Sequence, residues 1–104
     1  MEQVAFAMFL RPGQAEEYRR RHDAIWPELA QALHEAGVRD YSIFLEPATH
    51  VLFAVLRRTD DHTSDQLPRR EVMQRWWRHM ADLMDTNADG SPRQVGLEPM
   101  FHLD

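Results

Sequence analysis

Two segments of the sequence are apolar on both faces of a β-strand, and this pattern restricts the folds open to the chain. Residues 4–10 read Val-Ala-Phe-Ala-Met-Phe-Leu, and residues 51–56 read Val-Leu-Phe-Ala-Val-Leu. Successive side chains of a strand point to opposite faces, so these strands present apolar residues on both. A sheet of this kind must be covered on both faces. We therefore expect helices on one face and a further protein surface on the other.

The other segments complete the order β-α-β-β-α-β, which is the order of a ferredoxin-like α+β fold. Pro27 divides the first helical region, because the residue before a proline avoids helical backbone angles. Helices in this motif cover one side of the sheet, so we expect a second copy of the chain to cover the other. The expected helices are Gln14 to Trp26, Pro27 to Ala36 and Glu71 to Met84, and the expected strands are Val4 to Leu10, Tyr41 to Leu45, Val51 to Leu56 and Leu97 to Leu103.

Length and composition exclude several classes of function. A chain of 104 residues predicts one domain spanning 1–104. The net charge of −5 argues against a nucleic-acid partner. The chain has no cysteine, and its six histidines lack paired metal-ligand spacing, so we expect no metal site. It has no visible signal peptide and no apolar run of the roughly 20 residues that a membrane span needs, so we expect a cytoplasmic protein without membrane contact.

The first helix carries the candidate catalytic group. His22 lies in the middle of the apolar stripe of this helix, and Tyr18 lies one turn earlier on the same face. An imidazole exchanges protons near neutral pH, and a phenol beside it can donate a hydrogen bond to a substrate. From these residues alone, a structural histidine in the core is slightly favoured. We interpret the basic triplet Arg19 to Arg21 as a solvated face, since acidic residues flank it.

The last helix contains adjacent tryptophans, Trp76 and Trp77. Neighbouring residues of a helix point about 100° apart, so the two indoles cannot share one pocket. One of them can form the wall of a binding cleft while the other packs in the core. Helical periodicity alone favours core packing for both.

Taken together, these residues resemble the L-rhamnose mutarotase family over nearly the whole chain. The resemblance implies a dimeric α/β barrel without a cofactor, with His22 as the proton donor. It also implies that Tyr18, Tyr41, Trp76 and Trp77 contact the sugar. His102 departs from the family pattern, which has an aromatic residue such as tyrosine there. The matching stretches are Glu17 to His22, Ile25 to Leu29, Tyr41 to Leu45, Gln74 to Trp77 and Asn87 to Pro92.

The expected activity is interconversion of the α and β pyranose anomers of L-rhamnose or a similar deoxy-hexose, by acid/base ring opening and closing. Two alternatives on the same dimeric barrel remain open. One is a cofactor-dependent monooxygenase, and the other is a non-catalytic ligand-binding module.

Overall fold

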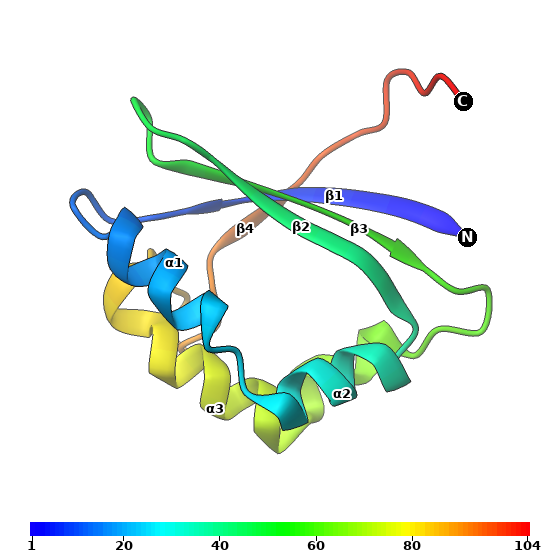
Figure 1. Cartoon of the computed structure of the whole chain (residues 1–104), viewed down its shortest axis with the longest axis horizontal. Helices are drawn as coiled ribbons and strands as arrows, with labels where there is room; N and C mark the ends of the chain where they lie inside the picture. Colours follow the sequence, from blue (N-terminus) through cyan, green and yellow to red (C-terminus); the bar gives the residue numbers. More distant parts are fainter.

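The computed structural model describes all 104 residues and consists of one antiparallel sheet with its helices on one side (Figure 1). The helical layer and the sheet enclose the space in which the candidate site lies. The strands are β1 (Glu2–Phe9), β2 (Val38–Glu46), β3 (Val51–Arg58) and β4 (Gln94–Gly96), the α-helices are α1 (Ala15–Asp23), α2 (Pro27–Glu35) and α3 (Glu71–Met80), and the 3-10 helices are η1 (Ser64–Arg69) and η2 (Ala81–Leu83).

The strand order β2-β3-β1-β4 is that of a ferredoxin-like sheet, which confirms the expected α+β class and chain order. All neighbouring strands are antiparallel, and β1 pairs with β3 along its whole length. The first helical region ends before Pro27, as expected, and α2 begins with this proline at its first turn.

The expected final strand is wrong in position. The strand β4 covers Gln94–Gly96, and Leu97 makes a last backbone hydrogen bond to Ala5 before the chain leaves the sheet. Pro99 follows closely and has no N–H to donate to a neighbouring strand, which explains why pairing does not continue. Residues 98–104 therefore form an extended tail outside the sheet.

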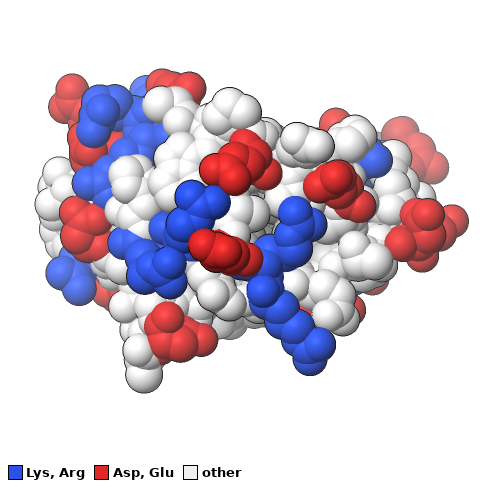
Figure 2. Space-filling model, turned by 90° about the horizontal axis from the view of Figure 1, so that it is seen from below, with Lys and Arg blue, Asp and Glu red and all other residues white.

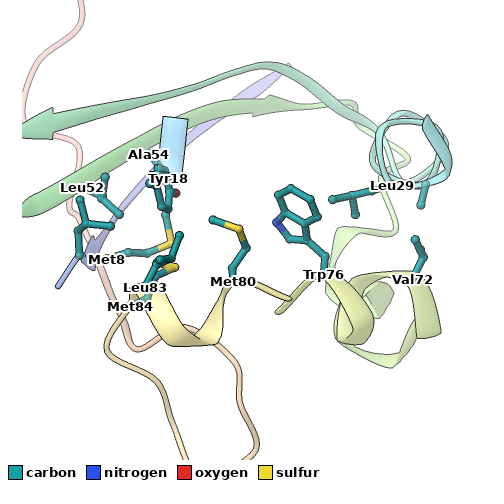
Figure 3. Close-up of a cluster of buried hydrophobic side chains, with 12 residues drawn as sticks. Met8, Tyr18, Leu29, Leu52, Ala54, Val72, Trp76, Met80, Leu83 and Met84 are labelled. Atoms are coloured by element: carbon teal, nitrogen blue, oxygen red, sulfur yellow. The ribbon is translucent and has the colours of Figure 1, made fainter. Parts of the chain in front are cut away.

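The core lies between the helices and the inner face of the sheet. Leu52 of β3 and Leu29 of α2 are almost completely buried there. Tyr18 of α1 and Trp76 of α3 belong to the same buried cluster, which Figure 3 shows. Two of the candidate site residues are thus also part of the core.

The outer face of the sheet is apolar and is covered by no element of this chain. Phe44, Phe53 and Val95 are 64%, 41% and 48% exposed on it. Strand register joins Phe44 to Phe53, Phe53 to Ala7 and Ala7 to Val95, so these residues form one row across all four strands. The expected apolar character of both sheet faces is therefore present in the fold.

The surface on the helical side carries arginines interspersed with acidic side chains (Figure 2). Many of these charges are paired, as in the salt bridges of Arg75 with Glu28 and of Arg20 with Glu17. This side presents no continuous basic area of the kind that binds phosphate backbones. No helix of the chain has the length and apolar character required to span a membrane.

Candidate functional site

A cavity of about 670 Å³ lies between the inner face of the sheet and the helices. Its volume is within the range of small-molecule sites. Most of its wall is apolar, with Ile43 from β2, Ile25 after α1 and Met73 from α3 among the lining residues. Its polar and charged lining residues are Glu16, Tyr18, Arg19, His22, Asp23 and Tyr41.

The helix α1 places Tyr18 and His22 one turn apart on the wall of this cavity. Their rings are stacked, with centroids 4.3 Å apart. The Nδ1 atom of His22 lies 3.1 Å from the carbonyl oxygen of Tyr18, so Nδ1–H donates to that carbonyl. This hydrogen bond assigns the proton of the neutral imidazole to Nδ1 and leaves Nε2 as the proton acceptor.

Burial lowers the pKa of His22 below its ordinary value of 6.5. The Tyr18 carbonyl and the carboxylate of Asp23 oppose this effect, because both favour the charged imidazolium. Desolvation is the largest effect, so the imidazole is neutral at pH 7 and able to accept a proton.

The two tyrosines that line the cavity keep their protons over a wide pH range. Desolvation raises the pKa of Tyr18, and Tyr41, which lines the same cavity, adds to this increase. Desolvation also raises the pKa of Tyr41 to about 12. Tyr41 is 39% exposed and lines the cavity. No hydrogen bond contributes to either shift, so both hydroxyls are available as donors to a ligand.

Trp76 closes the site from the side of α3. The rings of Trp76 and His22 form an edge-to-face contact, with their centroids 5.4 Å apart and their planes at 89°. The ring of Trp26 packs on Trp76 at nearly the same angle, and the ring centroids of His79 and Trp76 are 5.5 Å apart. Aromatic pairs in such arrangements hold each other in place. The indole is therefore fixed next to the imidazole.

Trp77 does not line this cavity. It lies next to a separate pocket of about 260 Å³ with Gln74, Arg78 and Asp89, and it packs partly against the core. The structure thus brings His22, Tyr18, Tyr41 and Trp76 together and separates Trp77 from them. The cause is the 100° step between neighbouring helix residues, which turns the second indole away.

Arg21 does not lie on a solvated face, so the interpretation of the basic triplet is wrong for this residue. Its side chain is only 15% exposed and forms ion pairs with Glu17 and Asp82. The partner Asp82 is 61 positions away along the chain. No local sequence pattern reveals such a contact, whereas the flanking Glu17 was visible as a helical neighbour.

The charged residues at the cavity were also missed by the sequence reasoning. Glu16, Arg19 and Asp23 line it together with His22, although all three lie outside the apolar stripe of α1. They are exposed at the edge of the site. No group of three His, Asp or Glu side chains is arranged to hold a metal ion.

Known proteins resemble this chain in sequence and in fold. A family model described as L-rhamnose mutarotase matches residues 3–103. A protein of Burkholderia orbicola named L-rhamnose mutarotase is 62% identical over 104 residues, which cover both chains completely. The crystal structure of an L-rhamnose mutarotase from Formosa agariphila superposes with a TM-score of 0.93 at 41% identity, again with full coverage of both chains.

A protein structure from Mycobacterium tuberculosis is more distant. It has a TM-score of 0.60 and 16% identity, and the match covers 98% of this chain and 97% of the other. At that identity the likeness concerns the fold alone. The match to the family model and the identity to its named members lead to one conclusion: the chain belongs to the L-rhamnose mutarotase family.

Proposed function

We propose that this protein interconverts the α and β anomers of L-rhamnopyranose by acid/base ring opening and closing. The observation that carries the proposal is a neutral His22 whose free Nε2 adjoins a cavity lined by two protonated phenols. Membership of the L-rhamnose mutarotase family supports the same reaction. A monooxygenase and a non-catalytic binding module gain no support from the family match.

The proton transfers follow from the states of these groups. The neutral imidazole gives His22 the opposite of the proton-donor role that the family resemblance implies for ring opening. Its Nε2 accepts the proton of the anomeric hydroxyl while the bond between C1 and the ring oxygen breaks, which yields the open-chain aldehyde. The alkoxide that develops on the ring oxygen takes a proton from the tyrosine hydroxyl that is hydrogen-bonded to it. Rotation about the C1–C2 bond then presents the other carbonyl face, and the reverse transfers close the ring. Both residues return to their starting states, so no net proton is consumed.

The apolar wall of the cavity suits a deoxy-sugar. L-rhamnose has a methyl group where a hexose has a hydroxymethyl group, and a methyl leaves no hydroxyl to be desolvated without a partner. Ile25, Ile43 and Met73 provide apolar contacts of this kind. Trp76 offers an aromatic surface for the C–H face of the ring.

We also propose that the protein is a homodimer in which two sheets face each other. The row of apolar side chains on the outer face is the surface that a second copy would bury. The tail leaves the sheet on the side opposite the helices (Figure 1), and it carries exposed Met100, Phe101 and Leu103. These apolar side chains extend the surface available to the partner. The cytoplasm remains the proposed location.

Saturation-transfer NMR tests the proposed reaction directly. Saturating the anomeric proton of one L-rhamnose anomer reports its exchange into the other anomer. We expect the exchange rate to rise above its buffer value in proportion to the protein concentration. An exchange rate that stays at the buffer value for L-rhamnose and related deoxy-sugars would refute the proposed activity.

A further inference from the structure

The position of α1 depends on side-chain contacts more than on backbone packing. The helix α2 approaches α3, η1 and β2 closely along its backbone, whereas α1 has no comparable approach to any other element. Yet α1 carries both Tyr18 and His22. The distance between these residues and Trp76 on α3 must therefore be set by groups that cross the gap between the two helices.

Arg21 is the side chain that crosses this gap with the most contacts. Its Nη1 donates to the carbonyl oxygen of His79 at 2.6 Å and to the carboxylate of Asp82 at 2.8 Å. Its Nη2 donates to the other oxygen of Asp82 at 3.2 Å. Its Nε donates to Glu17 within α1 at 2.8 Å. Four of the five N–H donors of the guanidinium are thus used, which fixes the plane of the group.

The location of these contacts matches the geometry of the site. Arg21 directly precedes His22 on α1, and His79 follows Trp76 by one turn on α3. The carbonyl of His79 lies in the last turn of α3, where backbone carbonyls lack helical partners and a cation is favoured. The link between the helices therefore lies within one turn of the contact between His22 and Trp76.

We infer that Arg21 is a positioning residue that holds the His22 imidazole at its working distance from Trp76 and the bound sugar. This inference rests on the proposed function, in which His22 transfers the proton and Trp76 supports the sugar ring. Displacement of a catalytic group by about 1 Å can reduce a rate by about 100-fold. Loss of the link should therefore lower kcat more than it changes KM.

Arg20 provides a matched control on the same helix. Its side chain is 69% exposed and pairs only with Glu17, one turn earlier. Removing it eliminates one arginine and one ion pair with the same carboxylate, but leaves the link to α3 intact. The comparison thus separates the crossing contacts of Arg21 from general effects of charge on α1.

The experiment compares Arg21→Met, Arg21→Lys and Arg20→Met by saturation-transfer kinetics with L-rhamnose. We expect Arg21→Met to lower kcat by about 10- to 100-fold with KM changed by less than about threefold. Arg21→Lys should recover part of the loss, because its single ammonium can reach Asp82 but cannot form the planar fork. Arg20→Met should retain the wild-type rate. Equal kcat values for wild type and folded Arg21→Met would overturn the inference, as would equal losses in Arg21→Met and Arg20→Met.

A structural measurement on the same variants does not depend on the reaction. The ring protons of His22 lie close to the Trp76 indole, so their NMR shifts respond to the distance between the rings. We expect these shifts to move in Arg21→Met and to stay in place in Arg20→Met. Unchanged shifts in Arg21→Met would overturn the inference even if the rate falls.

If wild type fails to accelerate anomer exchange, the proposed function fails, and the shifts alone decide the role of Arg21. Should Arg21→Met not fold, Arg21→Lys supplies the same two measurements.

Discussion

Replacing Phe53 with aspartate should prevent the pairing of two sheets. Phe53 lies on β3, one of the two central strands, in the middle of the apolar row on the outer face of the sheet, and is 41% exposed. A phenylalanine side chain has about 200 Å² to bury, so a partner would cover about 80 Å² of this residue. At about 25 cal/mol per Å², this burial contributes about 2 kcal/mol per copy.

Two-fold symmetry places the substitution twice in the interface, so the loss is about 4 kcal/mol, or about a 1,000-fold increase in the dimer dissociation constant. Any desolvation of the new carboxylates adds to this loss. Sedimentation equilibrium over a range of protein concentrations measures the constant. Ala30→Asp is the control, because it adds the same charge to an exposed position of α2 on the helical side. A dimer constant unchanged in Phe53→Asp, or a wild type that is monomeric at tens of micromolar, would refute the reasoning.

Three further predictions concern the titration of His22, the backbone at Gly37 and the two tryptophans of α3. Because burial lowers the pKa of His22 below 6.5, the neutral imidazole persists into mildly acid solution. The acidic limb of the kcat/KM profile, which reports groups of the free enzyme, should therefore lie below pH 6.5, and a limb above 6.5 would contradict the assignment. The lowered pKa also contributes to folding stability. This contribution is present above pH 6.5, the pKa in the unfolded chain, and is lost as the pH falls from 6.5 through the lower pKa of the folded protein. Gly37→Ala should lower stability by about 2–4 kcal/mol, measured as a lower Tm, because Gly37 has a φ of +90° and a Cβ there would clash with Thr59; an unchanged Tm would show that the loop adapts. Trp76→Phe should weaken L-rhamnose turnover, whereas Trp77→Phe should leave it near the wild-type value, since only the first indole lines the cavity; steady-state kinetics in which the second variant loses more would reverse this order.

The sequence was informative about the elements and their order because its signals are local. Alternating and continuous apolar runs mark β1 and β3, and Pro27 marks the break between α1 and α2. The final strand was displaced because the apolar residues after Leu97 resemble a strand, although Pro99 interrupts further pairing. Apolar composition alone does not distinguish a paired strand from an exposed tail.

The site was predicted in part, for a reason that is also physical. The helical period placed Tyr18 and His22 on one face, which the structure retains. It also gave the 100° step between Trp76 and Trp77 but not which indole faces the cavity, because that depends on the rotation of α3 against the sheet. The contacts of Arg21 were hidden, since its partners His79 in α3 and Asp82 in η2 lie 58 and 61 positions away along the chain.

The most direct test of the central claim is the rate of L-rhamnose anomer exchange with wild type and with His22→Asn. Asparagine retains a polar side chain near the Tyr18 carbonyl but cannot transfer a proton near neutral pH. The proposed mechanism predicts that wild type accelerates the exchange and that the variant, with an unchanged circular dichroism spectrum, loses about 10²- to 10⁴-fold of the rate. A folded His22→Asn protein that retains the wild-type exchange rate would contradict the role of His22 as the proton-transfer group.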